Sequence, residues 1–235
     1  MYVPVFIQKL FGSVTWRIPC AEPTLFLTFD DGPVPEVTPH VLRILESYNA
    51  KATFFCLGDN VEKHRDLYEK ILSEGHVVGN HTSHHLNGWK VSLNEYLKDV
   101  ALCDKVLSLV NDQHSTVHSP QSKVNSSNLV SDLLLTADRR PSTKIFRPPY
   151  GKLSWSQYDV LSTHYTIVMW DLLSRDYDQS LTGEACFQKV VDHATSGSIV
   201  VFHDSVKAKA RVLDALPKVL EYFSKKNYLF RAINK

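Results

Sequence analysis

The stretch from Thr24 to Pro33, TLFLTFDDGP, constrains the fold of this chain more than any other. An apolar and β-branched run leads directly into two carboxylates, Asp30 and Asp31, and a Gly-Pro pair then turns the chain. This pattern predicts a buried strand that ends in two acids. Because neighbouring side chains on a strand point in opposite directions, we expect the two aspartates to have different roles. Alone, the pattern equally fits an ordinary strand-to-turn exit, because Asp-Gly is a common turn pair.

The rest of the chain alternates between short apolar runs and helical patterns. Runs at 52–57, 76–81, 144–147, 165–170, 198–202 and 228–233 predict further strands. Continuously apolar strands are typical of a parallel sheet that is buried on both faces. The sequence therefore predicts an α/β fold.

Polar residues follow several of these predicted strands at the point where each one ends. They are Asp30 and Asp31, His81, Arg147, Asp171 and His203. A doubly wound sheet would gather its site at one crevice, whereas a parallel barrel draws catalytic groups from several strands at one edge. This distribution favours a barrel over an open sheet.

Composition limits the classes of function. The 235 residues carry a net charge of +1, which gives no electrostatic case for nucleic acid or an acidic membrane surface. No stretch approaches the ~18 apolar residues that a membrane span needs. The first 19 residues lack the basic start and apolar centre of a signal peptide, so a cytoplasmic location is the default expectation. Four widely spaced cysteines predict reduced thiols rather than disulfides.

Two segments stand apart from the predicted barrel. Residues 1–22 are expected to pack on it, with 14–18 as an edge strand or a lid. Residues 111–143 are rich in Ser, Asn, Asp and Gln and are long for a connection, so they predict an insertion in a domain spanning 23–235.

A metal site is suggested by His81 and His85, which one helical turn would place on the same side of the chain. Together with Asp31 they would form a mixed nitrogen and oxygen site for Zn²⁺ or a similar divalent ion, with a position left open for water. Taken alone, an HxxxH pair also fits a solvated helix face. His84 between them is expected either to support the ligands from behind or to lie at the rim of the site.

The remaining polar residues suit proton chemistry. Asp30, left free by Asp31, can act as a general base beside a divalent ion. Arg147 could keep that carboxylate ionised and oriented through paired hydrogen bonds. His203 ends a buried strand and suits a general acid.

Four ordered motifs in this chain resemble those of the polysaccharide deacetylases, which form carbohydrate esterase family 4 and share the NodB-homology domain. They are TFDDG at 28–32, HTxxH at 81–85, RPPY at 147–150 and VFH at 201–203. Each motif is weak alone, but their order and their positions at strand ends make the set specific. The resemblance covers residues 23–233 apart from the insertion.

The resemblance implies a distorted (β/α)7 barrel and metal-dependent removal of acetyl groups from N-acetylated sugars, such as chitooligosaccharide or peptidoglycan. It implies Asp31, His81 and His85 as ligands of a divalent metal, with Zn²⁺ favoured over Co²⁺, Mn²⁺ or Ni²⁺. It also implies Asp30 as the base, Arg147 as its orienting partner, the Tyr150 backbone N–H as an oxyanion donor and His203 as the acid.

The fourth motif of the family departs from its usual form here. Its Asp-Trp pair corresponds to Asp176-Tyr177, and Leu173 occupies the place of an earlier acid. The residues that would form an apolar wall of the substrate pocket are therefore less well defined, and so is the group that would set the pKa of His203. Asp171 is an alternative group for setting this pKa.

Three other functions compete with N-deacetylation. The same chemistry would cleave O-acetyl groups, which leaves an esterase on acetylated polysaccharide open. A catalytically silent carbohydrate-binding relative is a second alternative, although the acids and histidines are intact. A metal-dependent nuclease using Asp30 and Asp31 is disfavoured by the near-neutral charge. The sequence does not predict the sugar, its chain length or the oligomeric state.

Overall fold

Strand β1 lies inside a parallel sheet, between β2 and β7, in the computed structural model, which describes residues 14–114 and 144–234. The order is β5-β4-β3-β2-β1-β7-β6, and β8 pairs with the start of β1. The strands are β1 (Thr24–Asp30), β2 (Thr53–Cys56), β3 (Val77–Asn80), β4 (Ile145–Phe146), β5 (Thr166–Ile167), β6 (Leu172–Leu173), β7 (Ile199–His203) and β8 (Leu229–Phe230).

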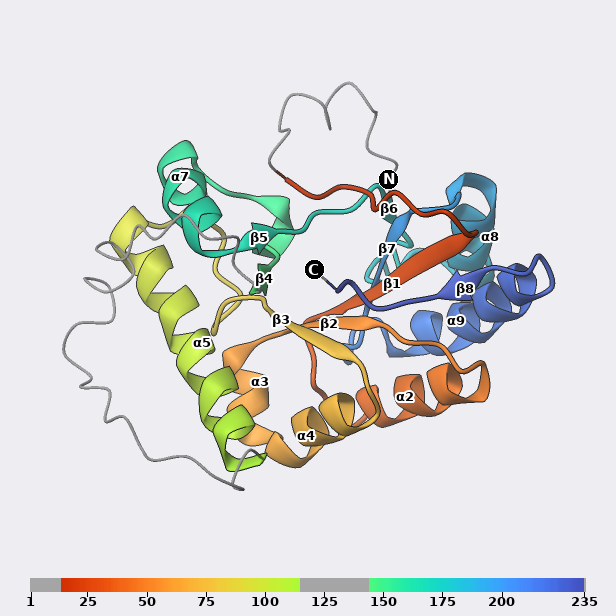
Figure 1. Cartoon of the computed structure of the whole chain (residues 1–235), viewed down its shortest axis with the longest axis horizontal. Helices are drawn as coiled ribbons and strands as arrows, with labels where there is room; N and C mark the ends of the chain where they lie inside the picture. The colour runs from red at the N-terminus through yellow and green to blue at the C-terminus, as the bar shows by residue number, and fades with distance from the viewer. Residues whose placement is uncertain (1–13, 115–143, 235) are drawn as a thin grey trace.

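Helices connect most of these strands and form an arc around the outside of the sheet (Figure 1). They are α2 (Thr38–Ser47), α3 (Gly58–Lys63), α4 (Arg65–Ser73), α5 (Leu93–His114), α7 (Trp155–His164), α8 (Gly183–His193) and α9 (Lys209–Ser224), with a short 3₁₀ turn, η1 (Pro149–Gly151). Among the described residues, no helix is both long and apolar enough to cross a membrane.

The predicted α/β fold is confirmed, as a curled parallel half-barrel that stays open between its edge strands β5 and β6. Residues 14–18 run along this open side (Figure 1). Thr15 forms a parallel bridge with Val168 after β5, and Arg17 forms an antiparallel bridge with Ser198 before β7. The N-terminal segment thus links two parts of the sheet through single bridges rather than as a continuous strand.

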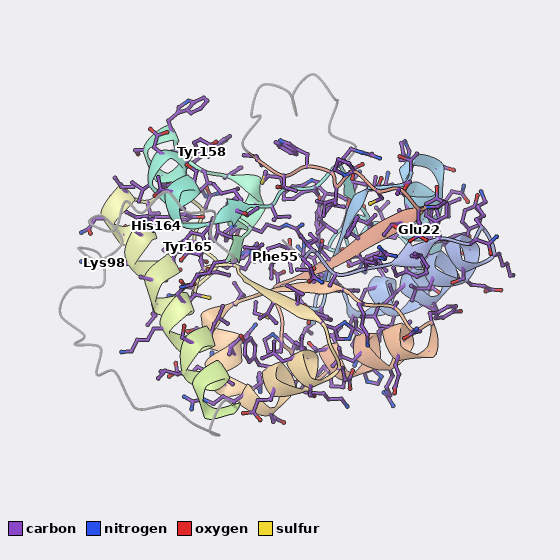
Figure 2. All side chains as sticks on the ribbon, viewed as in Figure 1. Glu22, Phe55, Lys98, Tyr158, His164 and Tyr165 are labelled. Carbon is purple, nitrogen blue, oxygen red and sulfur yellow. The ribbon has the colours of Figure 1, made fainter. Side chains whose placement is uncertain are left out.

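The two faces of β1 serve different purposes. Leu25, Leu27 and Phe29 pack into the large core between sheet and helices, where Phe29 stacks on Phe54 at 5.0 Å between ring centroids. Phe26 faces the inside of the curl, in a smaller cluster with Phe55, whose side chain lies among the central strands in Figure 2. Because side chains alternate along a strand, Asp30 shares the inner face with Phe26.

The segment between β2 and β3 forms two helices, α3 and α4, which meet at His64. Helix α5 continues to His114, so the first four residues of the insertion predicted at 111–143 are helical, and residues 115–143 lie outside the described part. The predicted free thiols are confirmed, with Cys20 exposed and the other three buried.

Candidate active site

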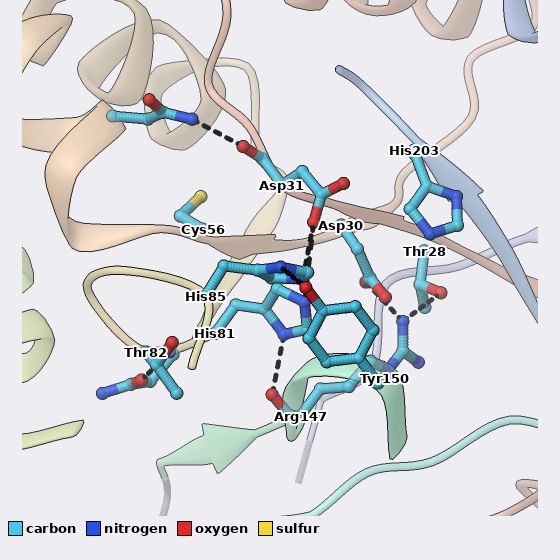
Figure 3. A network of polar contacts seen from close by, with 12 residues as sticks. Thr28, Asp30, Asp31, Cys56, His81, Thr82, His85, Arg147, Tyr150 and His203 are labelled. Carbon is cyan, nitrogen blue, oxygen red and sulfur yellow. Dashed lines mark hydrogen bonds and ion pairs between the residues drawn. The ribbon is translucent and has the colours of Figure 1, made fainter. Parts of the chain in front are cut away.

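The carboxyl ends of β1, β3, β4 and β7 converge on one edge of the sheet. Asp30 pairs in register with Phe55 of β2 and with His203 of β7, and Asn80 of β3 pairs with Phe146 of β4. The next residues along β1, β3 and β4 are Asp31, His81 and Arg147. Parallel pairing therefore gathers the acids, histidines and arginine of the sequence motifs into one cluster, which Figure 3 shows.

Asp31, His81 and His85 form a compact group of possible metal ligands. One ligand atom from each lies within 4.8 Å of the other two. The Oδ1 atom of Asp31 is 3.3 Å from Nε2 of His85 and 3.7 Å from Nε2 of His81 (Figure 3). Both imidazoles thus present Nε2 toward the same carboxylate.

Hydrogen bonds at the far side of each ring fix this orientation. Nδ1 of His81 donates to the backbone oxygen of Arg147 at 2.7 Å, and Nδ1 of His85 lies 3.1 Å from the hydroxyl of Tyr150. A metal-binding histidine commonly uses its second nitrogen in this way, which holds the tautomer with Nε2 free. Burial lowers the pKa of His81 to about 4, so its imidazole is neutral, as a ligand must be.

The group fits a divalent cation. The Oδ1 atom of Asp31 is buried and has no hydrogen-bond partner among the described residues. A buried carboxylate oxygen without a partner is costly unless a cation compensates it. Two imidazole nitrogens and one carboxylate oxygen are ligands typical of catalytic Zn²⁺ sites. The cluster could therefore bind a metal ion with a position left for a further ligand.

The backbone at this edge is held in unusual conformations. Seven described non-glycine residues have positive φ, and four of them belong to the site: Asp31, Thr82, His85 and Tyr150, with φ of 80°, 66°, 56° and 61°. Such conformations persist where the surroundings enforce them, and they concentrate at functional sites. One such contact is the amide of Asn60, which donates to the backbone oxygen of Asp31 at 2.7 Å.

Asp30 and Arg147 form a buried ion pair beside this group. Nη1 of Arg147 donates to Oδ1 of Asp30 at 2.7 Å, through one arginine nitrogen rather than the paired bonds expected from the sequence. The same Nη1 donates to Oγ1 of Thr28 at 2.7 Å, while Nε and Nη2 donate to the backbone oxygens of Val168 and Met169. Arg147 is fully buried, and its guanidinium lies 4.1 Å from the centre of the Phe55 ring.

The electrostatic surroundings keep Asp30 ionised. Burial alone would raise its pKa, but the positive charge of Arg147, reinforced by His81 and His203, holds the pKa below its usual value of 3.8. The pKa of Arg147 is lowered by burial. The site therefore contains a carboxylate that is nearly buried and charged at neutral pH.

His203 lies across the site from the histidine pair and is held by Asp176. Its Nδ1 is 2.7 Å from one carboxylate oxygen of Asp176, and its backbone N–H donates to the other at 2.7 Å. Burial would lower the pKa of His203, but Asp176 outweighs it and raises the pKa to about 9. The ring of Tyr177 packs edge-on against the imidazole, 5.2 Å away.

The alternative expectation that Asp171 sets the pKa of His203 is wrong. Asp171 directly precedes β6 and bonds to Arg17 and Ser198, residues that adjoin the amino end of β7. It was expected to follow a strand over 165–170, but β5 ends at Ile167. Asp171 therefore lies at the opposite edge of the sheet from the site.

Sequence reasoning missed three polar residues at this edge. Thr28, which accepts from Arg147, also donates to the backbone oxygen of Val200. Asp99 on α5 accepts the backbone N–H groups of Ser83 and His84, and its carboxylate contacts the His84 ring. In the sequence, Asp99 stands out only as an acid between the apolar positions of a helical pattern. His84 itself is about half exposed, consistent with the expected rim position.

Asp204 is the third missed residue, and it follows His203 directly. It is fully buried, accepts from the Thr38 hydroxyl at 2.6 Å and donates its backbone N–H to the backbone oxygen of Asp30. Burial raises its pKa to about 7. A Cβ added at Gly32 would lie 2.0 Å from its carboxylate, so this contact explains the glycine after the two acids.

Comparison with known proteins identifies the family of this chain. The family model for polysaccharide deacetylase matches residues 18–165. A peptidoglycan-N-acetylglucosamine deacetylase of Bacillus cereus is 31% identical over 95% of this chain and 92% of its own length. A chitooligosaccharide deacetylase of Azorhizobium caulinodans is 29% identical over 80% of this chain and 77% of its own length.

A solved structure agrees as well. The crystal structure of a peptidoglycan N-acetylglucosamine deacetylase in complex with 4-naphthalen-1-yl-N-oxidanyl-benzamide has a TM-score of 0.78 and 27% identity. The match covers 99% of this chain and 95% of the other. The chain therefore belongs to the polysaccharide deacetylase family and is a deacetylase of carbohydrate esterase family 4.

Proposed function

We propose that this protein removes acetyl groups from N-acetylated amino sugars of a glycan, either peptidoglycan or chitooligosaccharide, with the help of a divalent metal ion. The observation that carries the proposal is the ionised, buried Asp30 beside the ligand group of Asp31, His81 and His85, with His203 on the other side. The names of the relatives favour N-acetylated sugars as substrates.

Asp31, His81 and His85 would hold the metal, and Zn²⁺ suits their two nitrogens and one oxygen best. When bound, the ion polarises a carbonyl group and lowers the pKa of water. Hydrogen bonds from the far nitrogen of each ring, to Arg147 and Tyr150, keep both imidazoles oriented.

Asp30 would act as the general base. Its ionised carboxylate takes a proton from the water that attacks the acetamide carbonyl carbon. Arg147 orients Asp30 through Nη1 and keeps its pKa low. Because every nitrogen of the Arg147 guanidinium has an acceptor, the arginine is fixed in one position.

The backbone N–H of Tyr150 is proposed to donate to the oxyanion that forms when water adds to the carbonyl. Tyr150 has a φ of 61° inside the turn η1, so its backbone departs from the helical conformation at this residue. Its ring lies 4.6 Å from the His85 ring, so this turn borders the ligand group directly.

His203 would act as the general acid. The carbon–nitrogen bond breaks as His203 gives a proton to the departing amine, and acetate is released. Asp176 keeps His203 protonated by raising its pKa to about 9 and holds the ring through Nδ1, which leaves Nε2 to donate.

Acetate release tests the proposal. The metal-reconstituted protein should release acetate from N-acetylglucosamine oligomers or peptidoglycan fragments, and more slowly from acetylated xylan. Faster release from acetylated xylan would instead identify an O-acetyl esterase. Binding of the oligomers without acetate release from any of these substrates would identify a catalytically silent carbohydrate-binding protein.

A further inference from the structure

We propose that Asp204 is a positioning residue of the active site, whose buried carboxyl group holds the turn that carries Asp30 and Asp31. The inference rests on the proposed function, which gives these two aspartates their roles. Asp204 directly follows His203 at the end of β7 and is fully buried, yet it takes no part in the proposed reaction. Its Oδ1 atom has no hydrogen-bond partner among the described residues, and a buried polar atom of this kind requires an explanation.

The first contact of Asp204 is with the strand that carries the base. Strands β1 and β7 pair in parallel up to Asp30 and His203, and the backbone N–H of Asp204 then donates to the backbone oxygen of Asp30 at 3.1 Å. The side chain of Asp204 lies directly against Gly32. A Cβ added to this glycine would be 2.0 Å from Oδ2 and 2.4 Å from the carboxyl carbon. The backbone of the turn therefore packs against the carboxyl group with no side chain between them.

The second contact is with the first residue of α2. Thr38 is fully buried, and its hydroxyl donates to Oδ2 of Asp204 at 2.6 Å. The same hydroxyl accepts the backbone N–H of Val34 at 2.7 Å. Asp204 thus contacts the segment after β1 at two places, Gly32 and Thr38. Movement of this segment away from β7 would leave buried polar groups without partners, which is unfavourable.

The opposite side of the turn is held by residues that follow β2. The backbone N–H of Leu57 donates to the backbone oxygen of Gly32 at 3.0 Å. The side-chain amide of Asn60 donates to the backbone oxygen of Asp31 at 2.7 Å. Asp31 has a φ of 80°, a conformation that its surroundings must maintain. Asp204 supplies the corresponding support on the side of β7.

Neither contact of the carboxyl group requires a negative charge. Burial raises the pKa of Asp204 to about 7, and the negative charges of Asp31 and Asp30 act in the same direction. An asparagine amide has nearly the same shape and keeps an oxygen for the Thr38 hydroxyl. Alanine instead leaves a cavity beside Gly32. The two substitutions therefore separate support of the turn from the loss of an acid.

The test compares these two variants. Asp204→Ala should lower kcat for acetate release from an N-acetylglucosamine oligomer by about tenfold to hundredfold, with little change in KM, because a small displacement of Asp30 misplaces the base. Zn²⁺ affinity, measured by competition with a chelator, should fall about tenfold, because Asp31 lies on the same turn. Asp204→Asn should recover most of both losses. The matched control is Val190→Ala, which truncates a fully buried residue of α8 and should lower stability without changing kcat or Zn²⁺ affinity.

A milder change on the other side of the contact keeps the test decisive if Asp204→Ala does not fold. Thr38→Val removes the hydroxyl that donates to Asp204 and keeps the shape of the side chain. It should lower kcat and Zn²⁺ affinity in the same direction as Asp204→Ala, by a smaller factor. Thr38→Ser, which keeps the hydroxyl, should change both values less than Thr38→Val.

The outcomes separate this inference from the proposed function. Unchanged kcat and Zn²⁺ affinity in folded Asp204→Ala, or equal losses in Val190→Ala, would overturn the inference while leaving deacetylation intact. Equal losses in Asp204→Asn and Asp204→Ala would also overturn it, because the acid itself would then be required. If the unmodified protein releases no acetate, but Asp204→Ala weakens Zn²⁺ binding and Asp204→Asn restores it, the proposed function fails and the support of the turn stands.

Discussion

The sheet carries a pair of aspartate and arginine at each of its two ends, and the pairs differ in their surroundings. At the carboxyl end, Asp30 contacts Arg147, which is fully buried. At the amino end, Asp171 contacts Arg17, whose side chain is 29% exposed and which also donates to Thr195 and Ser196. The first pair lies beside the metal ligands, and the second fastens the N-terminal segment to the sheet.

The pKa of each aspartate shows what the difference means. Burial raises the pKa of both, but only Asp30 has Arg147, His81 and His203 to reverse the effect. Asp171 has Arg17 alone among arginine and histidine side chains that shift it, and its pKa stays above the usual value. A single arginine thus leaves the pKa of Asp171 raised by burial, whereas the surroundings of Asp30 bring its pKa below the usual value.

The largest expected difference is catalytic. Asp30→Asn should lower kcat for acetate release by about 10²–10⁴-fold, because the general base is removed. The matched change Asp171→Asn should leave kcat within a few-fold of the unmodified protein. Circular dichroism would check that both variants are folded. Equal losses of kcat in two folded variants would remove the functional distinction between the pairs.

The second difference is in stability. Arg17→Met should lower the free energy of unfolding by about 2 kcal/mol, because Asp171 keeps its burial and loses a charged partner. Urea denaturation measures this change, and kcat of the folded protein should stay the same. A stable Arg17→Met variant with reduced kcat would mean that the amino end affects the chemistry directly.

The pH dependence sharpens the assignment of the acid. His203 donates a proton only when protonated, and its pKa of about 9 keeps it so at neutral pH. Activity should therefore fall as the pH rises through about 9. Asp176→Asn removes the negative charge that raises this pKa, so the alkaline fall should move to lower pH. A fall at the same pH in Asp176→Asn would exclude His203 as the titrating group. The nearby, partly exposed Asp178 provides the control variant, Asp178→Asn.

The smallest expected effect concerns the loop that carries the metal ligands. Asp99 accepts two backbone N–H groups of this loop, so Asp99→Asn should weaken Zn²⁺ affinity by about tenfold. Competition with a chelator of known affinity measures the change. Ser198→Ala, which loses a hydrogen bond at the amino end, is the control and should bind Zn²⁺ normally. Equal weakening in both variants would show that the effect is general loosening of the fold.

The same comparison shows how far the sequence predicts this structure. Asp30, Asp31 and His81 follow apolar runs that are long enough to locate their strands, so their meeting at one edge could be predicted. Asp171 could not be placed, because the apolar run 165–170 contains a two-residue strand and a crossing segment, which periodicity does not separate. Its neighbours Arg17 and Ser198 are distant in sequence.

Supporting residues were harder to predict than the reactive ones. Asp99 reaches the site from α5, and its role depends on how that helix packs against the loop after β3. The contacts of Asp204 depend on how closely the end of β7 approaches the turn after β1, which is distant in sequence. These features arise from tertiary packing, which a local sequence pattern does not predict.

Removal and return of the metal tests the central claim most directly. The protein would be stripped with a chelator, dialysed and titrated with Zn²⁺ while acetate release from an N-acetylglucosamine oligomer is measured. We expect activity to vanish on stripping and to return fully at about one ion per chain, whereas Asp31→Asn should not recover at that ratio. Full activity of the stripped protein, or full recovery of Asp31→Asn at one ion per chain, would contradict the assignment of Asp31, His81 and His85 as the catalytic metal site.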